Sequence, residues 1–375
     1  MNNNNELTTI NQNAKLALVK SKNLLDITKK ILDKKVNDEW IKKLFIWADE
    51  RNIPNYEWVE DDDFEDGGYY NGISRNKDVL FRVKILRLNN LNIEFLPDEF
   101  FNLIHLEELI ISSSNLEILS TKIKYLENLT NLGLVKNKLS ELPNELMCLT
   151  KLKSIHLNNN KFKEFPDVIC KIKLLTHICI GSNHVKEIPK EISNLSELEE
   201  FNIANNQLEE VTLELFNLKK LKILKLGVNP IRQLSKEIGN LLNLEELYIF
   251  ENELEELPLE LFNLKKLKIL VLARNPIRQL LREIGNLLNL EKLYIFENKL
   301  EELPIELSNL KKLKILFLSS NNIRQLPKEI DNLLNLKEFY IDDNQLILNN
   351  EQKKFILYLK QNGCNVKYDE DKISF

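Results

Sequence analysis

The chain has 375 residues, of which 43 % are hydrophobic and 29 % charged, with a formal net charge of −5 and only nine glycines. This composition is typical of a soluble folded protein and argues against the basic face that a nucleic-acid partner needs. The longest apolar runs are far shorter than the roughly 20 residues that cross a bilayer, so we expect no transmembrane segment.

Residues 1–12 are rich in asparagine and are predicted to be a disordered tail. The N-terminus lacks the continuous apolar core of a secretory signal. The four cysteines have no paired spacing that would indicate a disulfide framework or a metal clip. These features predict a reducing, cytoplasmic location.

Residues 13–35 are predicted to form a basic amphipathic helix. Leu24, Ile27 and Ile31 recur at helical spacing, and seven lysines surround them. Such a helix can pack on the rest of the chain, self-associate, bind a partner or lie on an anionic membrane surface. We favour packing or self-association and keep membrane contact by residues 14–35 as an alternative.

Residues 36–82 are predicted to cap the array that follows. Residues 37–54 have the pattern of a helix with Asn37 as N-cap, Trp40, Leu44 and Trp47 on one face, and Pro54 at its end. The acidic run at 59–68 has alternate carboxylates like a calcium loop. It lacks the glycine and the glutamate that such a loop needs at its sixth and twelfth positions, so we expect no metal there.

A leucine-type residue recurs every 23 residues from Leu86 to Phe339, which gives twelve repeats without insertion over residues 83–346. Each follows the pattern LxxLxLxxNxLxxLPxxIxxLxxL. Because alternate residues of a strand point to opposite faces, LxL predicts a strand whose leucines enter the core. The residues between them then face outward on a parallel sheet. The LPxxIxxL half predicts a turn through proline into a short convex helical segment.

Asparagine follows the predicted strand in ten of the twelve repeats. Its amide can donate to and accept from backbone groups that would otherwise be buried and unpaired. Leu91 and Ser114 replace it in the first two repeats, an irregularity that suits a terminal region. Residues 347–375 are predicted to be the C-terminal cap, with a helix over 350–363 that stops at Gly363 and an edge strand after it.

This repeat resembles the intracellular-type leucine-rich repeat of the LPxxIxxL class, found in cytosolic bacterial proteins and in animal signalling scaffolds. The resemblance covers residues 83–346. It implies an α/β leucine-rich repeat solenoid, a horseshoe with a parallel concave sheet, short convex helical segments and helical N- and C-terminal caps. It also implies a concave protein-binding face and no intrinsic catalysis.

The outward strand positions form columns across the predicted sheet, and the first column ends in five consecutive apolar or aromatic residues. At about 4.8 Å per strand they span roughly 20 Å. An aromatic strip with an acidic border is a common composition of binding faces. The predicted partner-binding residues are Tyr248, Phe250, Glu251, Val271, Arg274, Tyr294, Phe296, Glu297, Phe317, Tyr340, Asp342 and Asp343.

A recent internal duplication gives this strip a second interpretation. Residues 215–260 and 261–306 differ at eight positions, three of which are outward strand positions of the odd-numbered repeat. The segment YIFE is the same in both copies, at 248–251 and 294–297. The aromatic residues are therefore either partner anchors or neighbours that were copied together and cover one another.

We predict a non-catalytic interaction module that binds a protein or peptide partner on the concave face, without cofactor or metal. The alternative is a regulator, inhibitor or translocated bacterial effector that occludes a partner enzyme; plain structural packing ranks below both. No nucleophile, zinc or phosphate-binding motif is present in the sequence. His156 and Cys179 are expected to be column neighbours, with His177 close by. A metal site needs three or four converging ligands, and the outward strand positions around them are Asn and Gly, so these residues predict a solvated surface.

Overall fold

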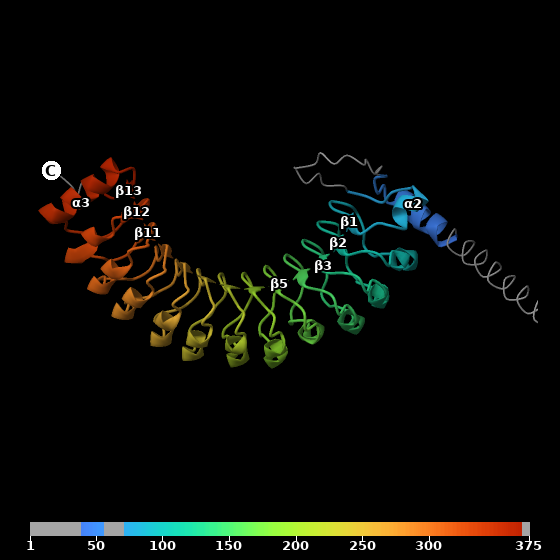
Figure 1. The fold of residues 1–375 in the computed structure, drawn as a ribbon, viewed down its shortest axis with the longest axis horizontal. Helices are drawn as coiled ribbons and strands as arrows, with labels where there is room; N and C mark the ends of the chain where they lie inside the picture. The colour runs from blue at the N-terminus through green and yellow to red at the C-terminus, as the bar shows by residue number, and fades with distance from the viewer. Residues whose placement is uncertain (1–38, 56–70, 370–375) are drawn as a thin grey trace, which may run out of the picture.

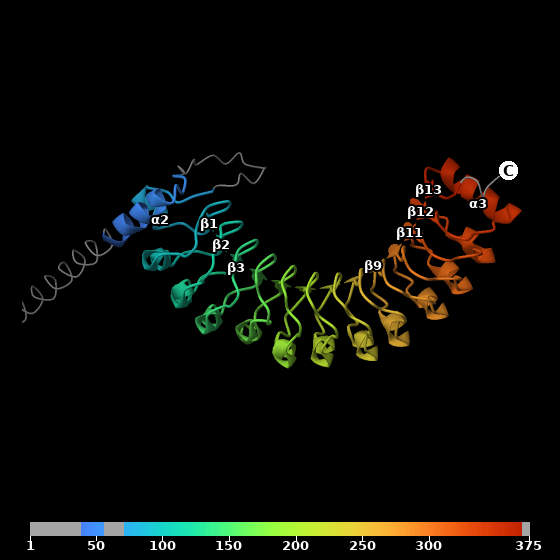
Figure 2. The same ribbon diagram turned by 180° about the vertical axis from the view of Figure 1, so that it is seen from behind.

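The computed structural model describes residues 39–55 and 71–369. They form one curved array, with the strands along its inner, concave side and short helices along its outer, convex side (Figure 1; from behind, Figure 2). Thirteen parallel strands make a single sheet in chain order from β1 to β13. The predicted α/β solenoid with a concave parallel sheet is confirmed.

Each repeat contributes one three-residue strand. Its middle residue is buried in β1 to β12, and both flanking residues are at least partly exposed in all of these except β3 and β5. The strands are β1 (Ile85–Arg87), β2 (Glu108–Ile110), β3 (Asn131–Gly133), β4 (Ser154–His156), β5 (His177–Cys179), β6 (Glu200–Asn202), β7 (Ile223–Lys225), β8 (Glu246–Tyr248), β9 (Ile269–Val271), β10 (Lys292–Tyr294), β11 (Ile315–Phe317), β12 (Glu338–Tyr340) and β13 (Asn365–Lys367).

The register of the sheet follows the 23-residue repeat. Leu86 lies opposite Leu109 at one end of the array, and Leu316 lies opposite Phe339 at the other. Because parallel strands keep this register throughout, every outward position of the repeat forms a straight column across the sheet. The columns read from the sequence therefore exist in the structure.

The asparagine that follows each strand connects neighbouring repeats. Asn275, for example, donates from Nδ2 to the carbonyl of Ile249 at 2.8 Å, in the preceding repeat, and to that of Leu272 at 3.0 Å. Its Oδ1 accepts from the backbone N–H of Leu254 at 3.2 Å. Side-chain amides thus satisfy inward backbone groups that strand pairing cannot reach, as predicted.

The irregular second repeat keeps this function with a smaller side chain. Ser114 is fully buried, and its hydroxyl donates to the carbonyl of Leu88 at 2.8 Å. The same oxygen accepts from the backbone N–H of Leu91 at 3.2 Å. The departure from asparagine therefore changes the residue but preserves the link between the first two repeats.

The residue before each of these positions, which asparagine occupies in ten repeats, has a left-handed backbone. Its φ lies between 51° and 59° in all twelve repeats. Only glycine and, less often, asparagine or aspartate adopt this region readily. Most side chains here are nevertheless other types, because the hydrogen bonds of the neighbouring repeats fix the turn. The residues are Asn90, Ser113, Lys136, Asn159, Ser182, Asn205, Val228, Glu251, Arg274, Glu297, Ser320 and Asp343.

The convex side carries eleven five-residue 3-10 helices. Proline precedes seven of them with φ between −54° and −70°, which matches the dihedral that its ring imposes. The helices are η1 (Asp98–Asn102), η2 (Thr121–Tyr125), η3 (Asn144–Cys148), η4 (Asp167–Lys171), η5 (Lys190–Asn194), η6 (Leu213–Asn217), η7 (Lys236–Asn240), η8 (Leu259–Asn263), η9 (Arg282–Asn286), η10 (Ile305–Asn309) and η11 (Lys328–Asn332).

A helix over residues 39–50 and the short helix α2 (Lys77–Leu80) precede the sheet. Leu44 and Trp47 of the first helix are buried, as the sequence predicts. Trp40 is not, because it lies at the margin and contacts Phe81 edge-on at 6.0 Å between ring centres. Ile41 occupies the buried position in its place.

At the other end, α3 (Asn350–Gln361) begins at Asn349, which forms a capping box with Gln352. The helix stops before Gly363, whose φ of +80° suits a residue without Cβ. Strand β13 then pairs in parallel with β12, as expected for an edge strand.

Four sequence predictions lie outside the described residues: the disordered tail at 1–12, the helix at 13–35, the N-cap at Asn37 and the acidic run at 59–68. Within the described ranges, none of the helices combines the length and apolar character required to span a bilayer.

Candidate functional site

The predicted aromatic column consists of Tyr248, Val271, Tyr294, Phe317 and Tyr340, the last residues of β8 to β12. All five are half-buried: they face the concave side, and none is enclosed by the coil. The residue before each of them is buried in the core. The structure therefore brings the five together on one face, where the sequence places them.

Three of these rings contact one another. Tyr294 meets Phe317 edge-on at 5.0 Å between ring centres, and Phe317 stacks on Tyr340 at 4.1 Å with an angle of 7° between the planes. Lys367 of β13 lies over the Tyr340 ring at 4.6 Å. The C-terminal part of the column is thus a preformed aromatic platform, whose rings partly shield one another from water.

Tyr248 stands apart from that platform. Its phenol donates a 2.7 Å hydrogen bond to Glu246, and the Lys225 ammonium lies 5.9 Å from its ring centre. Burial, the hydrogen bond to Glu246 and the charge of that carboxylate raise the pKa of Tyr248 above its ordinary value. Tyr248 is therefore a neutral, oriented ring at neutral pH.

The two phenylalanines of the predicted site are less available than the sequence suggests. A Cβ added to Gly227 would lie 2.5 Å from Cε1 of Phe250, so this ring lies directly on the backbone of the preceding repeat. Ala273 occupies the same position before Phe296 and is only 2 % exposed, although its column faces outward. Phe250 thus packs partly against the array itself, and the burial of Ala273 indicates the same packing for Phe296.

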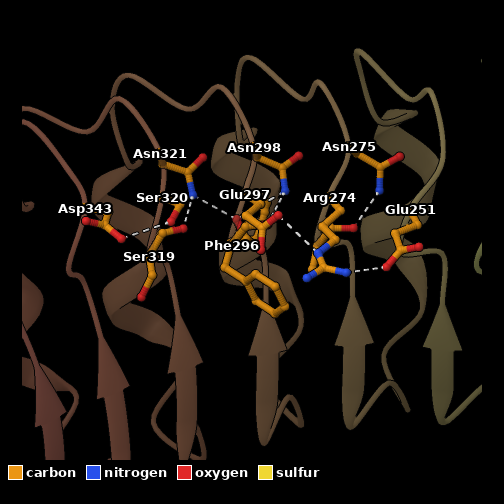
Figure 3. A network of polar contacts seen from close by, with 12 residues as sticks. Glu251, Arg274, Asn275, Phe296, Glu297, Asn298, Ser319, Ser320, Asn321 and Asp343 are labelled. Atoms are coloured by element: carbon orange, nitrogen blue, oxygen red, sulfur yellow. Dashed lines mark hydrogen bonds and ion pairs between the residues drawn. The ribbon is translucent and has the colours of Figure 1, made fainter.

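The predicted acidic border contains its own counterion. Arg274 lies between two carboxylates, with Nη1 at 2.5 Å from Glu251 and Nε at 3.1 Å from Glu297 (Figure 3). The two glutamates and the arginine all come from the left-handed position of consecutive repeats. Glu251, Arg274 and Glu297 together carry one net negative charge.

The acidic border continues with Asp342 and Asp343, which accept hydrogen bonds from Ser319 and Ser320 of the preceding repeat. The backbone N–H of Asp343 also donates to Asp369 at 3.0 Å. No described basic side chain forms an ion pair with Asp342 or Asp343, so this end of the border stays negative.

The site also contains residues that the sequence reasoning missed. Ile223, Ile269 and Ile315 open β7, β9 and β11, and each is partly exposed on the concave face. They alternate with Glu246, Lys292 and Glu338 on β8, β10 and β12. The sequence already indicates that these isoleucines face outward, because the first position of a strand faces the same side as the third.

The histidines at the centre of the sheet do not form a metal site. The Ser154 hydroxyl lies 2.8 Å from His156 Nε2, and the Thr176 hydroxyl lies 2.8 Å from His177 Nδ1. Burial and the nearby His177 lower the pKa of His156. Within residues 39–55 and 71–369, no group of three His, Cys, Asp or Glu side chains is placed to hold a metal.

Family comparisons agree with this geometry. The sequence matches the family described as "Leucine-rich repeat region" over residues 120–230, and the family "Leucine Rich Repeat" over residues 312–333. No curated protein matches the chain.

Solved structures give the same picture. A leucine-rich repeat protein of Leptospira interrogans is 28 % identical, with 76 % of this chain and 90 % of that chain covered and a TM-score of 0.53. The plant peptide hormone receptor RGFR1 in complex with RGF2 is 26 % identical over 70 % of this chain, with a TM-score of 0.61; the match spans 48 % of the receptor chain. An internalin from Listeria monocytogenes shares the fold at 20 % identity, with 78 % and 88 % coverage and a TM-score of 0.63. The chain is a leucine-rich repeat protein that resembles bacterial leucine-rich repeat proteins.

Proposed function

We propose that the chain is a non-catalytic interaction module that binds a protein or peptide on the concave face of β8 to β12. The observation that carries the proposal is the aromatic column, whose rings are ordered by the array but remain half-exposed on its concave face. A similar solved structure, the plant receptor, is described as a peptide hormone receptor in complex with RGF2, which supports a peptide or protein as the partner class.

The physical argument is that the column is rigid before a partner arrives. Tyr294, Phe317 and Tyr340 hold one another in fixed orientations, and the strand register fixes their spacing. Tyrosine and tryptophan dominate binding energy at interfaces because they offer large area at low entropic cost. A partner that covers this strip would remove the remaining aromatic area from water without reorganising the sheet.

An inhibitor or effector that occludes an enzyme would use the same surface. The difference would lie in the partner, because an occluded enzyme loses activity whereas an adaptor or peptide motif is only held.

The proposal is tested by selecting binders from a displayed random-peptide library on the folded chain. Tyr294→Ser is then compared with His156→Ser, which changes the same column six strands or more from the platform. We expect Tyr294→Ser to weaken the selected binders by about 2 kcal/mol, on the order of thirtyfold in Kd. His156→Ser should leave them unchanged. Binders that lose affinity only with His156→Ser would place the site elsewhere.

A further inference from the structure

Strand β9 differs from the two strands beside it. β8 and β10 carry the same outward Tyr, Phe and Glu, whereas β9 presents Ile269, Val271 and Ala273 between them. The duplicated repeat has Lys225 at the position of Val271, and Lys225 forms an ion pair with Glu200 at 2.7 Å. β8 and β10 differ at their first outward position, which is Glu246 in β8 and Lys292 in β10. Between their shared tyrosines, β9 has an aliphatic residue where the sister strand β7 has a charged one.

The spacing of these strands defines what fits between the rings. Alternate strands of a sheet are about 9.6 Å apart, so a group above Val271 would lie about 4.8 Å from each tyrosine ring. That distance suits one aliphatic side chain or one proline ring in contact with both aromatic walls. Tyr248 and Tyr294 would then contact its two sides, and Val271 would form the floor.

We propose that Tyr248, Val271 and Tyr294 form a subsite for an extended, proline-rich peptide that carries a basic residue; this rests on the proposed function of the concave face. A polyproline II helix has three residues per turn and rises about 3.1 Å per residue, so every third residue faces the same side at about 9.3 Å intervals. This interval matches alternate strands. A residue above Val271 would place the third residue after it above Phe317.

Hydrogen bonding agrees with this occupant. A polyproline II backbone has no internal hydrogen bonds, so its carbonyls remain available as acceptors. Within the described parts of the chain, no group forms a hydrogen bond with the Tyr294 phenol, which is thus a free donor beside the subsite. Tyr248, by contrast, is held in place by Glu246.

The unpaired carboxylate on the concave face is the reason to expect a basic residue in the peptide. The concave positions of the three repeats that contain β8 to β10 include five carboxylates and three basic groups. Two of these basic groups, Lys268 and Arg274, form ion pairs with Glu245, Glu251 and Glu297, and Lys314 of the following repeat pairs with Glu291. The third basic group, Lys292, opens β10 and forms no described ion pair. Glu246 has no described basic partner and accepts only from the Tyr248 phenol. A lysine or arginine on the Tyr248 side of the proline would meet this carboxylate, whereas the same position on the Tyr294 side is Lys292.

The duplicated repeat supplies variants that the fold already tolerates. Val271→Lys copies the residue of the sister strand into the subsite, and Lys225→Val creates a second aliphatic strand beside Tyr248. The probe is a fluorescent peptide of about twelve residues built from Pro-Pro-Arg triplets, and binding is followed by fluorescence anisotropy. A peptide of Ala-Ala-Arg triplets has the same charge and serves as the control for electrostatic attraction.

We expect the proline peptide to bind at least about tenfold more tightly than the alanine peptide. Val271→Lys should remove that difference, and Lys225→Val should increase it about threefold, with both melting temperatures close to that of the parent chain. Equal binding of the two peptides, or full binding to Val271→Lys, would overturn the subsite. Library-selected peptides that need Tyr294 but tolerate Val271→Lys would leave the concave-face proposal standing and remove only the subsite.

Discussion

The asparagines that follow the strands link neighbouring repeats, and the structure allows the loss of stability on removing one of them to be calculated. Replacing Asn275 by alanine removes the donor for the Ile249 carbonyl at 2.8 Å and the acceptor for the Leu254 N–H at 3.2 Å. Both groups lie in buried residues of the preceding repeat. A buried backbone group without a partner costs about 1–3 kcal/mol, and partial relaxation reduces the sum, so we expect a loss of about 2–4 kcal/mol.

Asn275→Ser is the matched control, because Ser114 performs the same role naturally in the second repeat. The serine variant should retain part of the lost stability, since its hydroxyl can also donate to one carbonyl and accept from one N–H. Urea denaturation followed by circular dichroism gives the free energies. Hydrogen exchange at the Leu254 amide reports the local effect, since neighbouring repeats contribute most of the stability of a repeat array. An alanine variant as stable as the parent chain, or a serine variant no better than alanine, would refute the reasoning.

Three further predictions use different parts of the array. Gly227→Ala should displace the Phe250 ring yet cost less than about 1 kcal/mol in urea denaturation, because Ala273 already occupies the equivalent position; a larger loss would show that the ring cannot move. In the native chain, a thiol reagent at pH 8 should label Cys148 and leave the other three cysteines unlabelled, since burial protects them and raises their pKa to about 11 or 12; mass spectrometry counts the labels. Burial and the adjacent glutamate raise the pKa of Tyr248, so the neutral phenol stabilises the folded state fully below about pH 10, and this stabilisation is lost as the pH rises further. Ultraviolet titration of the parent chain against Tyr248→Phe should show one phenol that ionises late.

The parts of the fold that follow from periodicity could be predicted from the sequence. A constant interval of 23 residues fixes the register, and the alternation of a strand fixes which residues face outward. Leu86 and Phe339, the first and last residues of the series, therefore lie in the core as expected. The asparagine positions were equally clear, because a polar residue inside an apolar pattern must satisfy buried backbone groups.

The contacts within the candidate site could not be predicted in the same way. Whether Phe250 points to a partner or rests on Gly227 depends on its rotamer and on the space in the preceding repeat, and a periodic pattern specifies neither. The pairing of Arg274 with carboxylates on both sides likewise needs side-chain positions. The position of Ile269 does follow from the sequence, because the first residue of a strand faces the same side as the third, Val271.

The structure bears on whether the duplicated aromatic residues are partner anchors or neighbours that only cover one another. Covering one another accounts for Tyr294, Phe317 and Tyr340, and packing on the preceding repeat accounts for Phe250. Neither accounts for Tyr248, whose described contacts on the concave face are polar.

Duplication alone also does not explain the residue at Val271, on the strand between the two tyrosines. A duplicated pair of repeats with no function on its concave face would be free to vary at Tyr248 and Tyr294 as well as at Val271. Instead, Tyr, Phe and Glu are the same in both copies at 248/294, 250/296 and 251/297, whereas the strand between the tyrosines changed from Lys225 to Val271. The first outward position of the aromatic strands also changed, from Glu246 to Lys292. Strand β7 has a tyrosine on one side only, because β6 carries Asn202 in this column, whereas β9 lies between Tyr248 and Tyr294. An aliphatic residue in β9 in place of lysine is what the acceptance of an apolar group between the two rings would require.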